Sequence, residues 1–220
     1  MTAICHRHKF VYFPIPKNAT SSIKRVMYQL ETDRVWDKKE SKLLGVNIHA
    51  VYPTHAGSVW KRYFDTYTSL VIVREPISRF LSAYGNRVVH AKILQMNDSI
   101  ALKVKRARLS PAPDLDEFIA KFEDYRSISR EVDIHTLPQA RFVGKFWEKI
   151  TYRLPINNVT QVPGIIEKHT GMKIELPYTQ TGGPKFSADQ LSSKQTKILQ
   201  KVYRDDYKMF AGFLSFSKPF

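Results

Sequence analysis

The stretch that decides the fold is KFVYFPIPKNATSSIKRVMYQL, which runs from Lys9 to Leu30. Residues 10–13 form a short, β-prone apolar run bounded by prolines, and such a run predicts a buried strand. From Ile23 to Leu30 the apolar residues recur at helical spacing, which predicts a helix with one buried face. The residues in between, 16–22, are mostly polar. The stretch therefore predicts a strand, a tight polar turn and a helix.

The turn between this strand and this helix gathers groups that bind anions. Its backbone N–H groups and the positive end of the helix dipole point at one spot. Lys17 adds a cation, and Thr20, Ser21 and Ser22 add three hydroxyl donors. These groups predict a phosphate cradle. An ordinary Thr or Ser helix cap beside a solvated lysine explains the same residues, so the stretch alone leaves both interpretations open.

A second stretch, SLVIVREPISRFLSAYGNRVV at residues 69–89, repeats the pattern of strand and helix. Residues 70–73 are a continuous apolar run, which predicts a buried strand. Pro76 stands where a helix would begin, because proline is favoured in the first helical turn. The apolar residues that follow it recur at helical spacing and predict the buried stripe of that helix.

Arg74 lies between the second strand and its helix. This place is the rim at which open α/β sheets bind ligands, and Ser82 on the following helix is expected to converge with Arg74 on a second anion. A surface ion pair of Arg74 with Glu75 or with an aspartate is the alternative, and the residues alone do not decide between the two.

The composition limits the fold and the partners. With 220 residues, of which 43% are hydrophobic and 12% aromatic, the chain is expected to form one α/β domain over residues 1–220. The net charge of +15 favours a polyanionic partner such as nucleic acid, acidic glycan or anionic lipid, without choosing among them. Cys5 is the only cysteine, which excludes a disulfide within the chain and indicates a reducing compartment.

Two further segments are candidates for function. Residues 92–108 are basic and irregular, so they form either a solvated helix with a stiff linker or a surface that steers an acidic substrate. A polar loop is expected over residues 123–132, and it leads to DIHTLPQ at residues 133–139. His135 is expected in a loop beside a proline, a good place for proton transfer, although such a histidine is often only structural.

The two stretches together resemble the sulfotransferases that use 3′-phosphoadenosine 5′-phosphosulfate (PAPS), especially the carbohydrate sulfotransferases of the Golgi type, which are sulfotransferase family 2-like. Residues 16–22, PKNATSS, look like their 5′-phosphosulfate loop, and residues 73–84, VREPISRFLSAY, look like their 3′-phosphate motif. Residues 133–139 are similar to the segment that supplies a histidine in some members, and residues 203–213 resemble their C-terminal helix. The resemblance implies a single domain with a central, mostly parallel sheet flanked by helices, in a P-loop-like nucleotide-binding fold.

The resemblance also implies site residues. The PAPS co-substrate would be held by Lys17, Asn18, Ala19, Thr20, Ser21, Ser22, Arg74 and Ser82. Within this set Lys17 would meet the charge that develops on the bridging oxygen, and Arg74 with Ser82 would hold the 3′-phosphate. Lys185, in the loop with Gly182 and Gly183, is expected to close over the nucleotide on the basis of its position only. His135 is the expected base for the acceptor hydroxyl, with His49, His55 and Glu75 as weaker candidates, and no metal is expected.

The expected acceptor is a carbohydrate of anionic type, an acidic polysaccharide or a glycolipid, because the chain is basic. The sequence leaves a neutral sugar or a phenol open as alternatives. The lack of an N-terminal membrane anchor and of several cysteines favours a soluble, cytoplasmic protein, or else the luminal catalytic domain of a longer one. A nucleotide kinase would need GxxxxGK[ST], whereas Lys17 precedes the hydroxyl run and the turn has no glycine. A basic module that binds nucleic acid would interleave aromatics with lysines on one face, whereas most aromatics here fall on apolar helical stripes.

Overall fold

The computed structural model describes residues 2–54, 63–178 and 182–214. His55, one of the weaker base candidates, lies outside these residues, as do residues 179–181 of the loop before Lys185. The chain divides into two compact units. The first contains Met1–Arg74 and Gln139–Thr179, and the second contains Glu75–Pro138 and Gln180–Phe220. The single domain expected over residues 1–220 stays a prediction, and each unit is described by itself.

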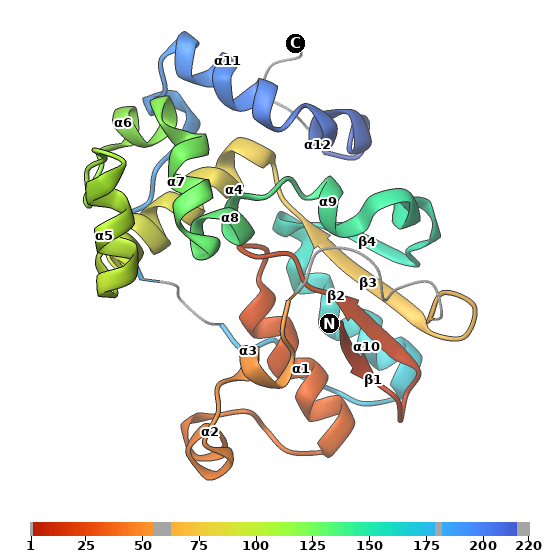
Figure 1. Ribbon diagram of the computed structural model, residues 1–220. Coiled ribbons are helices and arrows are strands. Elements are labelled where there is room, and N and C mark those ends of the chain that lie inside the picture. The colour runs from red at the N-terminus through yellow and green to blue at the C-terminus, as the bar shows by residue number, and fades with distance from the viewer. Residues whose placement is uncertain (1, 55–62, 179–181, 215–220) are drawn as a thin grey trace. The chain divides into compact units, whose positions relative to one another are not determined.

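A four-stranded sheet forms the centre of the first unit (Figure 1). Its strands β1 (Ala3–Cys5), β2 (Phe10–Phe13), β3 (Thr68–Val73) and β4 (Tyr152–Pro155) lie in the order β1-β2-β3-β4. β1 is antiparallel to β2, whereas β2, β3 and β4 are parallel to one another. The carboxyl ends of three neighbouring strands therefore meet at one edge, where α/β sheets bind their ligands.

Helices cover this sheet because its strands are apolar on both faces. Within the first unit these elements are α1 (Thr20–Thr32), α2 (Lys38–Leu44), α3 (Ile48–Val51), α9 (Ala140–Val143), η4 (Gly144–Lys149), η5 (Ile156–Gln161) and α10 (Val162–Thr170). Phe10, Tyr12 and Ile72 on one sheet face pack with Met27 of α1 and Ile166 of α10. The α/β fold with a mostly parallel sheet flanked by helices is confirmed.

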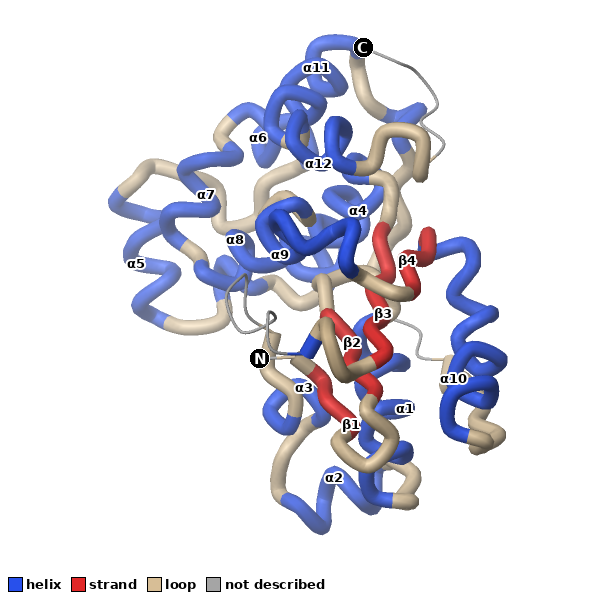
Figure 2. Tube along the Cα trace, turned by 90° about the vertical axis from the view of Figure 1, so that its right-hand side faces the viewer, coloured by secondary structure: helices blue, strands red, loops and turns tan. Residues whose placement is uncertain are grey.

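The second unit consists of helices in the part of it that the structure describes (Figure 2). They are α4 (Pro76–Ala83), η2 (Tyr84–His90), η3 (Ile93–Gln95), α5 (Asp98–Arg106), α6 (Leu115–Ala120), α7 (Phe122–Ile128), α8 (Arg130–Thr136), η6 (Ala188–Gln190), α11 (Ser193–Val202) and α12 (Arg204–Met209). Its core is aromatic: Phe80 stacks on Phe118 with ring centroids 5.7 Å apart, and Phe122 and Tyr203 also contact Phe80.

The loop expected around His135 is wrong. Residues 123–128 belong to α7 and residues 130–136 to α8, and His135 lies in the last turn of α8. The segment looks polar because its exposed face is charged, but Tyr125 and Val132 are buried. Ser129 starts α8 by accepting a hydrogen bond from Val132 N–H, the ordinary role of an N-cap serine.

No helix in the described ranges is long and apolar enough to cross a membrane. Within the same ranges, no three histidine, cysteine, aspartate or glutamate side chains are grouped so that they could hold a metal ion.

Candidate functional site

The turn after β2 has an unusual backbone. Lys17 and Ala19 have φ angles of 71° and 55°, in the left-handed region, although neither is glycine. Asn18 between them is not in this region. Each left-handed L-residue costs about 1–2 kcal/mol, so the surrounding structure must hold the turn in place. Alternating backbone hands of this kind are typical of concave anion sites, in which successive N–H groups turn toward one point. Asn18 N–H does not contribute to such a site here, because it donates to the Ile15 carbonyl at 3.3 Å.

The first turn of α1 keeps its positive end available for an anion. Its N-cap residue is Ala19, which has no side chain to cap the helix, and the first turn contains no acidic residue. Thr20 does not act as a cap either, because its hydroxyl donates to the Ile15 carbonyl at 2.6 Å. The alternative of an ordinary Thr or Ser cap is therefore wrong. Thr20 instead stabilises the turn by this hydrogen bond to the Ile15 carbonyl.

A buried amide network ties this turn to Arg74. Asn18 Nδ2 donates to the Ile72 carbonyl of β3 at 2.8 Å and to Gln139 Oε1 at 2.8 Å. Gln139 Oε1 also accepts from Arg74 N–H at 3.0 Å, and Gln139 Nε2 donates to the Arg74 carbonyl at 2.7 Å. Asn18 and Gln139 are fully buried. The two backbone segments that carry Lys17 and Arg74 are thus fixed relative to each other at the carboxyl edge of neighbouring strands.

Gln139 is a residue that the sequence reasoning did not assign to the site. It ends the DIHTLPQ segment, in which the sequence analysis assigned a role to His135 alone. The available signal was a polar residue directly after a proline, at the start of the apolar helix α9. Only the fold shows that this side chain returns to the edge of the sheet.

Ser21 belongs to a second polar chain on α1. Ser21 Oγ lies 2.9 Å from His49 Nε2, and His49 Nδ1 lies 3.3 Å from Lys24 Nζ. Lys24 Nζ also donates to Thr54 Oγ1 at 2.8 Å. The Lys24 side chain is fully buried, and loss of water around the ammonium lowers its pKa to about 8. His49 is therefore held beside the anion turn by two groups of α1.

The second unit contains the other expected residues. Ser82 is half-buried on α4, and Lys185 is exposed in the segment before η6. This segment packs closely on η2, because a Cβ added to Gly85 would lie 2.3 Å from the Pro184 carbonyl oxygen. Glu75 is the N-cap of α4: its carboxylate accepts from the N–H groups of Ile77 and Ser78, which explains its place in the motif without a catalytic role.

His135 has both ring nitrogens engaged. Its Nε2 accepts from Arg87 Nε at 3.1 Å, so the ring proton is on Nδ1, which lies 2.9 Å from the Glu131 carbonyl oxygen. Only 12% of the side chain is exposed. His135 would have to release Arg87 before Nε2 could accept a proton.

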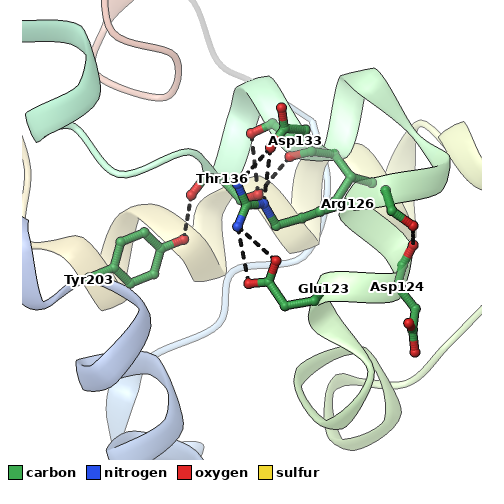
Figure 3. Close-up of polar contacts among 8 residues, drawn as sticks. Glu123, Asp124, Arg126, Asp133, Thr136 and Tyr203 are labelled. Atoms are coloured by element: carbon green, nitrogen blue, oxygen red, sulfur yellow. Dashed lines mark hydrogen bonds and ion pairs between the residues drawn. The ribbon is translucent and has the colours of Figure 1, made fainter.

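Side chains outside α8 hold the helix that carries His135 at two points, Asp133 and Thr136 (Figure 3). Arg126 of α7 donates to Asp133 Oδ1 at 2.8 and 3.0 Å and also pairs with Glu123. Tyr203, the residue between α11 and α12, donates to the Thr136 carbonyl at 2.8 Å. These contacts hold α8 against α7 and against Tyr203, so His135 has a fixed position within the second unit.

Arg79 binds the last carbonyl groups at the C-terminal end of the same helix. It is fully buried, and its guanidinium donates to the carbonyl of His135 at 2.9 Å and to that of Leu137. Burial lowers the pKa of Arg79, while the negative charge of Asp206 acts in the opposite direction. A cation at the carboxyl end of a helix is favourable for the helix dipole. The second arginine of the VREPISR motif is therefore a structural residue of the second unit.

Three parallel strand ends, with a turn of left-handed residues leading into a helix, define an α/β protein whose backbone at the edge of the sheet has a geometry typical of anion sites. A family model described as the sulfotransferase family matches residues 1–213. The chain belongs to the sulfotransferase family, and membership supports an enzyme that transfers a sulfuryl group. No curated protein and no solved structure matches the chain.

Proposed function

We propose that this protein transfers a sulfuryl group from PAPS to a hydroxyl of a carbohydrate acceptor, of anionic type. The acceptor oxygen forms the new bond to sulfur, and the bond between sulfur and the oxygen that bridges to the 5′-phosphate breaks. The leaving adenosine 3′,5′-bisphosphate takes the electron pair, and a base of the protein takes the hydroxyl proton. The transfer needs no change of oxidation state.

The observation that carries this proposal is the amide network of Asn18 and Gln139. It joins the anion turn to the Arg74 backbone, and a donor with one phosphate on each side of a ribose requires two anion sites at a set separation. Two solvated loops without this network would not keep that separation. The match of the family model to both segments supports the same donor.

The residues have separate roles in this proposal. Lys17 stabilises the charge on the bridging oxygen, and the N–H groups of residues 19–22 hold the 5′-phosphosulfate, since Asn18 N–H donates to the Ile15 carbonyl. Arg74 binds the 3′-phosphate. The nucleotide-binding roles expected from the sequence for Ser82 and Lys185, which belong to the second unit, stay predictions. Such prearranged donors act where charge develops in the transition state, and removal of one typically lowers kcat by about 10²–10³-fold. Lys17→Ala is expected to lose kcat by this factor.

Two histidines are candidates for the general base that takes the proton of the acceptor hydroxyl, and activity measurements on variants distinguish them. His135 is our first candidate, and His49 is the second because it contacts Ser21 of the anion turn. Turnover and affinity for adenosine 3′,5′-bisphosphate should be measured for His135→Ala and His49→Ala, with His6→Ala as an exposed control. The true base, when removed, should lower kcat by about 10²–10⁴-fold with the nucleotide affinity retained. Full activity in His135→Ala would transfer the role to His49 or to another group.

The donor is tested by two measurements. A ligand that binds the folded state raises its melting temperature, so adenosine 3′,5′-bisphosphate should stabilise the protein more than ATP with Mg²⁺ or a short oligonucleotide does. Labelled sulfate should then move from PAPS to members of a glycan panel. Stabilisation by ATP with Mg²⁺ alone would indicate a nucleotide kinase, and stabilisation by the oligonucleotide alone a nucleic-acid-binding module.

A further inference from the structure

A large pocket lies on the first unit beside the anion turn. Its volume is about 950 Å³, and its lining comes from α1, α2, α3 and the residues that connect α2 to α3. Both views show these three helices side by side (Figures 1 and 2). This volume is at the upper end of the range for small-molecule pockets. It is far larger than one inorganic anion needs and can take several sugar rings.

Three cations line this pocket without a carboxylate partner among the described residues. They are Arg25 of α1 and Lys38 and Lys42 of α2. Lys38 and Lys42 are four residues apart, so their like charges lie on one face of α2 and repel each other. Arg25 Nε is buried, yet the described part of the chain offers it no hydrogen-bond acceptor. An anion in the pocket would reduce the repulsion between Lys38 and Lys42.

The one acidic residue of the lining does not neutralise these cations. Asp37 caps α2, and its Oδ1 accepts from Glu40 N–H at 2.8 Å. The pocket lining therefore has three cations against one carboxylate that is already engaged. An anionic ligand suits this balance better than a neutral or cationic one.

The pocket walls are held in place before any ligand binds. Tyr28 of α1 and Trp36 pack edge to face with ring centroids 4.8 Å apart, and Ile48 of α3 joins the same apolar cluster. Tyr28 OH donates to the buried Glu40 of α2, which also pairs with Arg34 at 2.7 Å. These contacts join α1, α2 and α3, so little ordering is needed on binding.

Ser21 and His49 line the same pocket as the three cations, and Ser21 also belongs to the anion turn. We propose that this pocket binds the acceptor, and that Arg25, Lys38 and Lys42 recognise a carboxylate or sulfate on an acidic saccharide. The inference rests on the proposed sulfuryl transfer and adds the place and charge of the acceptor. It differs from the expectation that residues 92–108 form the acceptor surface.

The test compares two double variants that remove equal charge. Lys38→Gln/Lys42→Gln changes the pocket at exposed positions, and Lys103→Gln/Lys105→Gln changes the exposed face of α5. Each full-length protein is titrated calorimetrically with a uronate-containing chondroitin tetrasaccharide and with the same tetrasaccharide after its carboxyls are reduced to alcohols. Melting curves and the affinity for adenosine 3′,5′-bisphosphate are recorded for each.

The pocket variant should bind the acidic tetrasaccharide about three- to tenfold more weakly, because two exposed charge contacts are lost. Its melting temperature and nucleotide affinity should stay unchanged, and the α5 variant should bind the tetrasaccharide as the unmodified protein does. The reduced tetrasaccharide should bind more weakly to the unmodified protein and be insensitive to the pocket change. An equal loss in both double variants, or a loss in the α5 variant alone, would overturn the proposal, as would no binding of the acidic tetrasaccharide.

The two proposals can fail separately. If sulfate is transferred and the KM for acidic glycans is the same in the pocket variant, the pocket assignment is wrong and the transferase stands. If the pocket variant loses the tetrasaccharide but no glycan accepts sulfate from PAPS, the saccharide pocket stands and the proposed reaction fails.

Discussion

Replacement of Gln139 is the most direct test of the link between the turn that carries Lys17 and the backbone of Arg74, the two segments that we propose bind the anions of the donor. Gln139→Met keeps the volume of the side chain and removes its amide, so the N–H and carbonyl of Arg74 lose their partners. Asn18 Nδ2 loses one of two acceptors and keeps the Ile72 carbonyl. A buried polar group without a partner costs about 1–3 kcal/mol, so the free energy of unfolding should fall by about 2–4 kcal/mol.

Urea unfolding measures this loss. With a slope of about 2–3 kcal/mol per molar urea, the midpoint should fall by about 1 M. Gln95→Met is the matched control, because Gln95 is exposed and its side-chain amide donates to the Pro111 carbonyl. In Gln139→Met the affinity for adenosine 3′,5′-bisphosphate should fall more than that for adenosine 5′-phosphate, since the separation of the two anion sites is what the network sets.

Gln139→Glu separates the hydrogen bonds from the general fit of the side chain. A protonated carboxyl can donate to the Arg74 carbonyl and accept from Asn18 and Arg74 N–H, as the amide does, whereas a carboxylate cannot donate. Burial raises the pKa of this introduced group above the ordinary value of about 4.3, so the folded state binds more protons than the unfolded state. Stability relative to the unmodified protein should therefore fall as pH rises from about 4.3 through the raised pKa.

Two results would refute this reasoning. One is a Gln139→Met protein that unfolds at the same urea concentration as the unmodified protein. The other is a Gln139→Glu protein whose stability difference from the unmodified protein does not change with pH.

Three further predictions concern single residues. Lys24 has a folded-state pKa of about 8 against an ordinary 10.5. The free energy of unfolding of the unmodified protein should therefore rise by up to about 3 kcal/mol relative to that of Lys24→Met between pH 8 and 10.5, measured by urea unfolding at each pH. A difference that stays constant with pH would contradict the burial of this ammonium. Ala19→Gly should raise stability by about 0.5–1 kcal/mol, because φ is 55° there, whereas Ala101→Gly within α5 should lower it by about 1 kcal/mol in the same assay. Arg79→Met should destabilise the protein by about 2–4 kcal/mol in urea, since two carbonyl groups lose their donor, and an unchanged midpoint would show that these bonds contribute nothing.

The local pattern of the sequence was sufficient to predict the two strands and the helix start at the edge of the sheet. Runs of apolar residues at 10–13 and 70–73 correspond to β2 and β3, and Pro76 is the first residue of α4. These elements were predictable because strand burial and helix starts depend on residues close together in the chain. The helices over residues 123–136 were missed for the opposite reason, since their exposed faces are charged and their buried residues are few.

Composition and spacing alone predicted the α/β fold that the structure confirms, because a buried strand, a polar turn and an amphipathic helix are each visible in adjacent residues. The binding of an anion by the turn stays a prediction. The tertiary structure decided how the site is held together. Gln139 is 121 positions from Asn18 along the chain and 65 from Arg74, and the three meet only after parallel strands align their carboxyl ends. A hydrogen bond between distant residues leaves no periodic mark in a sequence, so only folding reveals it.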